Sequence, residues 1–268
     1  MIITRLIGGL GNQCFQYAVG RHLSEICHAE LKIDISEFEF YKIHAYSLNH
    51  LNIVENFATP DELAEVKHVR EKHFHFDPEI LQLPDKVYLL GYWQSEKYFK
   101  SIADIIRCEL SVKLPLSGRD KEVVGQIMCC DSVSVHIRRS DYLPNTYKEQ
   151  ILESCSFDYY LDSAKRIVRD LKKPHFFIFA DDILWVRDNF KLPYPVTFVD
   201  HNGADKNYED MRLMSLCKHN IIANSTFSWW GAWLNKNPNK KVFAPQKWFT
   251  EKARSSPRDL VPELWSKV

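Results

Sequence analysis

The sequence of 268 residues has no excess of either charge, no long apolar run and no CxxC pair. Its 35 basic residues balance 35 acidic ones, so composition favours neither a nucleic acid nor an anionic membrane as the main partner. No apolar run approaches the roughly 18 residues that a membrane-spanning helix needs. Met1 leads directly into a β-prone run without a charged, cleavable leader. These absences predict a soluble, cytoplasmic protein without a stable membrane span.

The number and spacing of the cysteines also indicate neither a metal site nor a set of disulfide bonds. An odd number without CxxC spacing predicts reduced thiols, mostly buried, and neither a disulfide framework nor a zinc site. The seven cysteines are Cys14, Cys27, Cys108, Cys129, Cys130, Cys155 and Cys217.

The first half of the chain alternates strand and helix patterns. Residues 2–7 read as a strand, 8–13 as a glycine loop, 15–26 as a helix and 31–35 as a second strand, which together predict a βαβ unit and a parallel sheet. Thr59, Pro60 and Glu62 form a capping box with proline at the first helical position, which predicts a helix continuing through Arg70. Residues 86–93 read as another strand, followed by a helix that Ser95 caps.

A connecting stretch, residues 112–120, contains Pro115 and Gly118 and interrupts this pattern. We therefore expect an α/β fold with two facing domains, residues 1–118 and 119–268; one continuous sheet is the alternative. The alternation resumes after the connection. Strands are expected at 133–137, 175–182, 196–200, 220–225 and 241–245, with helices at 157–171, at 210–219 and from 226 onward.

The glycine loop, GGLGNQ, separates the first strand from the first helix. Gly9 and Gly11 would let the backbone approach a ligand closely, and Asn12 and Gln13 add polar side chains. The loop matches neither GxGxxG nor a phosphate-binding loop ending in GK[ST]. A tight turn without a ligand is the alternative.

A cationic segment, HIRRSDY, ends the strand at 133–137. Ligands of open α/β sheets bind beyond the carboxyl ends of strands, and arginine can hold a diphosphate through two hydrogen bonds. Arg138 and Arg139 reach one ligand together only if the strand has already turned into a loop. The alternative is a solvated edge where Arg139 pairs with Asp141.

A pair of carboxylates, Asp181 and Asp182, ends the next strand. A divalent metal would use such carboxylates, but no histidine or further carboxylate lies close by in the sequence, so we expect no metal site. Asp182 could instead accept two N–H donors from guanine, or cap the following helix.

Short polar side chains begin the Trp-rich helix NSTFSWWGAWL. A helix N-terminus carries unsatisfied N–H groups and partial positive charge, which suit a phosphate or diphosphate. The alternative is that Ser225 or Thr226 only caps the helix. The polar residues are Asn224, Ser225, Thr226 and Ser228.

Together these motifs resemble a known family. GGLGNQCFQYAVGRHL, HIRRSDY, FADD and NSTFSWWGAWL occur in this order, as in the bacterial α-1,2-fucosyltransferases of glycosyltransferase family 11. The resemblance covers about residues 1 to 250. HxRRxD is shared with α-1,6-fucosyltransferases and protein O-fucosyltransferases, whereas NSTFSWW combined with GGLGNQ is more selective. Two departures are small: Cys14 replaces methionine or leucine, and FADD replaces FSDD.

The resemblance implies two facing Rossmann-like domains of the GT-B type. Residues 1–118 would form the acceptor-side domain and residues 119–268 the GDP-sugar domain. The implied reaction is an inverting transfer of L-fucose from GDP-fucose to the 2-hydroxyl of a galactose-terminated glycan. No metal or other cofactor is implied. The protein would stay cytoplasmic, at the inner membrane surface only if its acceptor is lipid-linked.

The resemblance also implies roles for individual residues. Arg138 resembles the arginine that holds the donor diphosphate, and Arg139 would support it. Asp182 resembles the base-reading carboxylate. Asp141 and His136 are the candidate bases in the HIRRSDY segment, and we expect Asn12 to be a catalytic residue. Asn224, Ser225, Thr226 and Ser228 would lie at the phosphates, and Gly9, Gly11, Asn12 and Gln13 at the fucose and acceptor.

Three other functions remain open at the sequence level. The first is a transferase of the same architecture with another GDP-sugar or nucleotide-sugar donor. The second is a phosphohydrolase using His136 and the arginines. The third is a carbohydrate-binding module based on the tryptophans, although Trp229, Trp230 and Trp233 have the spacing of a helix core.

Overall fold

The computed structural model describes residues 1–40, 43–139, 155–250 and 257–268. The chain forms two compact units. Unit 1 is Met1–Leu114 with the described part of Ser255–Pro262, and unit 2 is Pro115–Arg254 with Glu263–Val268. The expected division after residue 118 placed the whole C-terminal segment in the second domain. In unit 1, however, the Asp259 carboxylate accepts hydrogen bonds from Phe76 N (3.0 Å) and Lys97 Nζ (2.7 Å).

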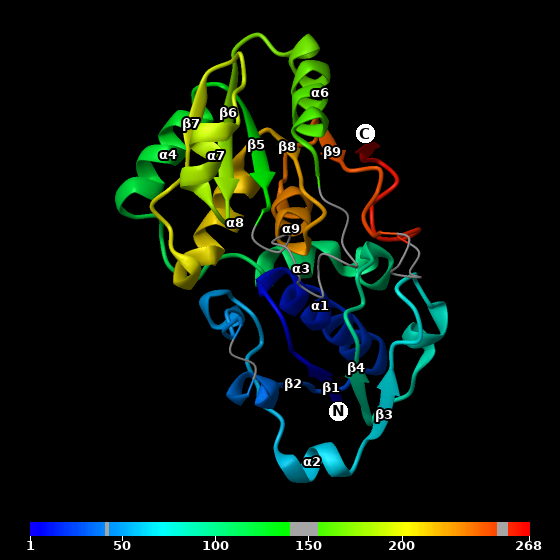
Figure 1. Ribbon diagram of the computed structural model, residues 1–268. Helices are drawn as coiled ribbons and strands as arrows, with labels where there is room; N and C mark the ends of the chain where they lie inside the picture. Colours follow the sequence, from blue (N-terminus) through cyan, green and yellow to red (C-terminus); the bar gives the residue numbers. More distant parts are fainter. Residues whose placement is uncertain (41–42, 140–154, 251–256) are drawn as a thin grey trace. The chain divides into compact units, whose positions relative to one another are not determined.

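Unit 1 contains a parallel sheet in the order β2-β1-β4-β3. The buried helix α1 connects β1 to β2, which confirms the predicted βαβ unit. Figure 1 shows these elements. The strands are β1 (Ile2–Arg5), β2 (Leu31–Asp34), β3 (Lys67–Arg70) and β4 (Val87–Leu90); the helices are α1 (Leu10–Cys27), α2 (Pro60–Ala64) and α3 (Ala103–Glu109).

The helix predicted to run through Arg70 is wrong beyond its first turn. The capping box of Thr59 and Glu62 is present, but α2 ends at Ala64. Residues 67–70 form β3 instead, paired in parallel with β4 from Lys67 opposite Val87 to Arg70 opposite Leu90. Backbone pairing with β4, residues distant in sequence, outweighs the local helical preference.

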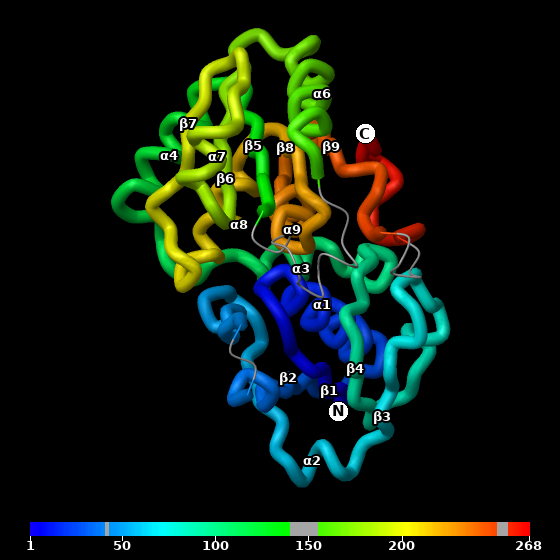
Figure 2. The backbone as a smooth tube through the Cα atoms, viewed as in Figure 1, coloured from blue at the N-terminus to red at the C-terminus, as the bar shows by residue number. Residues whose placement is uncertain are grey.

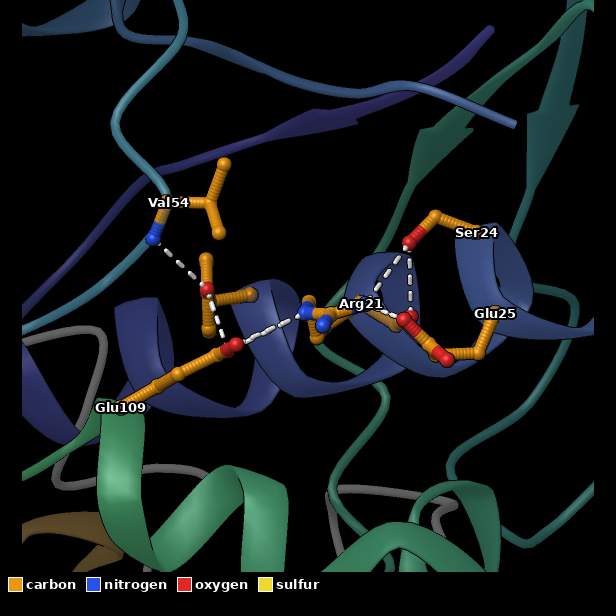
Figure 3. A network of polar contacts seen from close by, with 6 residues as sticks. Arg21, Ser24, Glu25, Val54 and Glu109 are labelled. Carbon is orange, nitrogen blue, oxygen red and sulfur yellow. Dashed lines mark hydrogen bonds and ion pairs between the residues drawn. The ribbon is translucent and has the colours of Figure 1, made fainter. Parts of the chain in front are cut away.

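Glu109 of α3 is bonded to the side of α1 (Figure 3). Its carboxylate accepts from Tyr17 Oη at 2.6 Å and from Arg21 Nε at 2.9 Å. The same Tyr17 oxygen accepts from Val54 N at 3.0 Å. Burial, and then the hydrogen bond to Glu109, raise the pKa of Tyr17. This network joins α3 and the chain at residue 54 to α1.

Unit 2 contains a parallel sheet in the order β10-β9-β8-β5-β6-β7. Figure 2 traces the backbone of this unit and labels β5 to β9. The strands are β5 (Asp131–Ile137), β6 (Pro174–Ala180), β7 (Val196–Phe198), β8 (His219–Ile221), β9 (Val242–Ala244) and β10 (Ser266–Lys267). The helices are α4 (Gly118–Met128), α6 (Phe157–Ile167), α7 (Ile183–Asn189), α8 (Asn207–Leu216) and α9 (Thr226–Leu234).

Helices cover both faces of the unit 2 sheet. Phe176 and Ile178 of β6 pack in a core with residues of α6 and α7. Phe177 and Phe179 of the same strand point to the opposite face and pack with residues of α4 and α8. Because successive strand residues face opposite sides, this continuous apolar strand is buried on both faces. The predicted α/β class with parallel sheets is confirmed.

The tryptophans of α9 belong to the core. Trp229, Trp230 and Trp233 are buried and pack edge-to-face or stacked against one another. The packing interpretation is therefore confirmed, and these rings form no sugar-binding surface.

All seven cysteines lie in the described residues, and none forms a disulfide bond. The expectation that most are buried is wrong: Cys14, Cys130 and Cys217 are buried, whereas Cys108 and Cys129 are exposed. Cys129 follows directly after the end of α4, and Cys108 lies in α3. Among the described residues, no helix is both long and apolar enough to cross a membrane.

Candidate functional site

The strand orders define a switch point in each sheet. In unit 2 the chain runs from β5 through β6 to β7 on one side, then returns to place β8 on the other side of β5. In unit 1 it goes from β1 to β2 on one side, and β4 lies on the other side of β1. Ligands of open α/β sheets bind where such connections diverge, beyond the carboxyl ends of the strands. The HIRR segment follows β5, the start of α9 follows β8, and the glycine loop follows β1.

His136 is the penultimate residue of β5, and its side chain is buried in an edge-to-face contact with Phe227. Burial lowers its pKa to about 4; the charge of Asp181 opposes this shift and the charge of Arg138 adds to it. The imidazole is therefore neutral near pH 7 and binds a proton weakly. A group with so low a pKa is a poor base for a sugar hydroxyl. Arg138 follows β5 directly and is half-buried.

Arg139 is held by the loop that follows β6. Its backbone N–H donates to the Asp181 carboxylate at 2.9 Å, and its Nη1 lies 2.6 Å from Asp182 Oδ2. The guanidinium also lies over the ring of Trp185, 4.1 Å from the centroid. These contacts fix Arg139 in a supporting position beside Arg138. The alternative pairing with Asp141 lies outside the described residues.

Asp182 has two structural partners. One carboxylate oxygen accepts from Trp185 N at 3.2 Å and so caps α7, and the other pairs with Arg139. The capping alternative raised by the sequence is present. A guanine base would compete with these partners for the same oxygens, so the contacts favour a supporting role for Asp182. Its base-reading role stays a prediction that the family resemblance implies.

The N-terminus of α9 is built from the predicted polar residues, which differ in what they can offer a ligand. Ser225 caps the helix by accepting from Phe227 N at 3.3 Å, and Ser228 Oγ donates to Ser225 O at 3.4 Å. Asn224 is buried and donates to Trp248 O. Thr226 is the first helical residue and is half-buried. Thr226 is thus the least buried of the predicted polar residues at this end of α9.

The unit 1 glycine loop is shorter than expected, because α1 begins at Leu10 and includes Gly11, Asn12 and Gln13 in its first turn. Gly9 is the N-cap, and a Cβ there would lie 3.6 Å from the His44 ring. His44 thus borders the loop.

Gln13 is fully buried. Its amide nitrogen donates to Gly8 O (2.8 Å) and Ala45 O (2.9 Å), and its oxygen accepts from Ser47 N (2.9 Å). Gln13 holds the chain at residues 45–47 against the loop, and both of its amide protons are used in doing so. This bonding favours a supporting role over direct substrate contact.

An acidic pair near the start of α8, with Asp120 buried and Asp210 half-buried, is a feature that sequence inspection missed. Asn202 Nδ2 donates to both Asp120 Oδ1 and Asp210 Oδ1, each at 2.9 Å. Burial, together with the charges of Asp120 and Glu209, raises the pKa of Asp210 to about 7. Asp120 and Asp210 are far apart in sequence, so no local motif signals their proximity. Within the described ranges, no group of three or more His, Cys, Asp or Glu side chains could hold a metal ion.

Comparison with known proteins gives a consistent assignment. A sequence model described as Glycosyl transferase family 11 matches residues 1–263. An alpha-1,2-colitosyltransferase of Escherichia coli is 33% identical, covering 100% of this chain and 99% of that protein. The O-antigen biosynthesis glycosyltransferase WbnK of Escherichia coli is 30% identical, covering 97% of this chain and 98% of that protein. Human galactoside alpha-(1,2)-fucosyltransferase 1 is 27% identical over 54% of this chain and 42% of its own length.

Solved structures show the same fold. Fucosyltransferase NodZ from Bradyrhizobium aligns with a TM-score of 0.53 at 13% identity, covering 85% of this chain and 90% of that one. A GDP complex of an Arabidopsis thaliana FUT1 mutant aligns with a TM-score of 0.51 at 10% identity, covering 97% and 74%. The expected GT-B type fold and the family resemblance are both confirmed.

Proposed function

Because the chain belongs to glycosyltransferase family 11, we propose that it transfers L-fucose from GDP-fucose to the 2-hydroxyl of a galactose-terminated glycan, with inversion at the fucose. The names of its relatives support an α-1,2 transfer, and the proposed reaction uses no metal ion.

The observation that carries the proposal is that the HIRR segment and the start of α9 both lie at the unit 2 switch point. β5 and β8 are neighbouring parallel strands, so Arg138 and Thr226 follow strand ends at the same edge of one sheet. A guanidinium and a helix N-terminus are both suited to a diphosphate. Asn224, Ser225 and Ser228 shape that helix end.

This arrangement suits the chemistry of glycosyl transfer. Breaking the fucose–phosphate bond leaves negative charge on the diphosphate, and each group placed to stabilise that charge contributes about 3 kcal/mol to lowering the barrier. Arg138 would supply the principal charge, with Arg139 behind it. The acceptor hydroxyl must lose a proton. His136 and Asp141 are the two proposed bases, and the low pKa of His136 makes it a weak one.

The experiment is incubation with GDP-fucose and a panel of β-galactosides, followed by linkage analysis of the product. We expect fucose on the galactose 2-hydroxyl and release of GDP. Another linkage, or transfer to a non-galactose acceptor, would contradict the acceptor assignment. Release of inorganic phosphate would indicate a phosphohydrolase, and sugar binding without any transfer would indicate a binding module.

A second donor deserves the same assay because a full-length relative is a colitosyltransferase. Colitosyl and fucosyl donors should be compared at equal concentrations with one acceptor. A kcat/KM at least tenfold higher for the colitosyl donor would show that colitose, and not fucose, is the transferred sugar. The class of reaction would be unchanged.

A further inference from the structure

The loop after β4, residues 91–94, is folded around the half-buried carboxylate of Glu71. Glu71 Oε2 accepts from Tyr92 N at 2.8 Å, and Oε1 accepts from Trp93 N at 2.9 Å. A Cβ on Gly91 would lie 2.4 Å from the Glu71 Cβ, so glycine is required beside it. Both carboxylate oxygens thereby fix the direction of the chain as it leaves β4.

Trp93, the third residue of this loop, has a backbone φ of +56°, and its side chain is buried. The left-handed region is unfavourable for a bulky residue, and such conformations persist where surrounding contacts impose them. The two hydrogen bonds to Glu71 are such contacts. This turn is followed directly by Gln94, whose side chain is only 7% exposed.

Gln94 reaches the site predicted after β1. Its Nε2 donates to Asn12 Oδ1 at 3.0 Å. β1 and β4 are neighbours in the sheet, so this bond crosses the unit 1 switch point. On the other side of the amide, a Cβ added to Gly8, whose φ is +82°, would lie 2.8 Å from Asn12 Nδ2. The Asn12 amide is therefore oriented with its oxygen toward Gln94 and its nitrogen toward the glycine loop.

Gln94 differs from the other buried amides of this region. Gln13 and Gln16 bond to backbone atoms only, as expected for residues that hold loops in place. The amide of Gln94 donates to another side chain, and that side chain belongs to the predicted site.

We propose that Gln94 is a positioning residue that fixes the Asn12 amide as a hydrogen-bond donor to an oxygen of the sugar substrate. The Asn12 oxygen accepts from Gln94, so the nitrogen is the end of the amide directed elsewhere, and an amide nitrogen donates hydrogen bonds but does not act as a base near neutral pH. Glu71 and the strained turn at Trp93 set the position of Gln94. The inference rests on the proposed glycosyl transfer and adds a residue to it.

The test is a double-mutant cycle with Asn12→Ala, Gln94→Ala and the double variant. We expect Asn12→Ala, which removes the donor, to lower kcat by about a hundredfold. Gln94→Ala keeps the donor but loses its orientation, and should lower kcat by about tenfold. The double variant should match Asn12→Ala alone, since Gln94 acts through Asn12. An unchanged kcat for Gln94→Ala, or a double variant about a thousandfold slower than wild type, would overturn the proposal.

Gln94→Glu distinguishes orientation from packing. A carboxylate accepts hydrogen bonds, so it would favour the reversed Asn12 amide, with the oxygen turned to the site. We expect a larger loss of kcat for Gln94→Glu than for Gln94→Ala at equal thermal midpoints. Equal or smaller losses would contradict the orienting role.

Two controls separate this inference from the function itself. Asn52→Ala removes another unit 1 amide, bonded to Ser111 Oγ at 2.9 Å, and should leave kcat unchanged. GDP affinity, measured by calorimetry, should be the same in wild type and all Gln94 variants because the proposed nucleotide site lies in unit 2. If wild type fails to use GDP-fucose, the proposed donor is wrong, and the cycle is measured with the nucleotide sugar that it does use.

Discussion

The Arg139 guanidinium lies between the Asp182 carboxylate, 2.6 Å from its Nη1, and the face of the Trp185 ring. Asp182 also caps α7, so the arginine, the acid and the helix form one supporting assembly at the end of β6. Arg138, the preceding residue, is therefore the arginine that we expect to act on the diphosphate, and the two adjacent arginines have different roles.

Replacement of Arg138 by alanine should abolish most transfer. We expect kcat/KM to fall by a factor of at least a hundred, because the charge that stabilises the departing diphosphate is lost. Arg138→Lys should also be poor, since an ammonium group cannot make two parallel hydrogen bonds. The measurement is steady-state kinetics with GDP-fucose, with the thermal midpoint as a check of folding. Near-normal turnover in Arg138→Ala would remove the diphosphate role.

Asp182→Asn tests whether this residue reads the base. Asparagine is a good N-cap, so the free energy of unfolding should change by less than about 1 kcal/mol. If Asp182 acts through Arg139, GDP and UDP affinities should fall by the same factor in calorimetry, and we expect this result from the contacts described. A narrower difference between GDP and UDP would instead establish the guanine-reading role that the family resemblance implies.

Asp210 should make stability depend on pH. Its folded-state pKa of about 7 lies above its ordinary value of 3.8, so the folded protein binds more protons between pH 4 and pH 7. The free energy of unfolding therefore falls as pH rises through that window. Asp210→Asn should stabilise the protein by about 1 to 2 kcal/mol at pH 8 and by little at pH 4, measured by chemical denaturation. The exposed residue Asp205 provides the control, since Asp205→Asn should show no such difference.

The reaction should proceed without a divalent ion. Our reason is that Arg138, Arg139 and the start of α9 would carry the diphosphate charge. Dialysis against EDTA should leave most of the activity, and added magnesium or manganese should alter it only modestly. Activity lost to EDTA and restored by a single metal would contradict this proposal and make Asp181 and Asp182 candidate ligands.

Local patterns in the sequence predicted much of the architecture. Short apolar and β-prone runs located β1, β5 and β6, and the Thr59 capping box marked the correct start of α2. The order of the motifs indicated the family, since each motif is a continuous segment whose chemistry can be read without neighbours. The place of Trp229 and its neighbours in the core followed from helical spacing alone.

Other features depended on contacts between distant residues. Residues 67–70 became a strand because β4 pairs with them, and residues 257–262 belong to unit 1, where Asp259 is bonded to Phe76. Glu71 and Gln94 were not among the predicted site residues, and their roles arise from bonds to Trp93 and Asn12.

The sequence by itself therefore determined the fold class, the family and the segments that hold the proposed site. The physical reason is that periodic burial and motif chemistry are properties of short stretches of chain. Only the tertiary structure decided that Arg139 is bonded to Asp182, that His136 is neutral, and that Gln94 orients Asn12. Hydrogen-bond geometry and the pKa shift of a buried group depend on which residues the fold brings within a few ångströms.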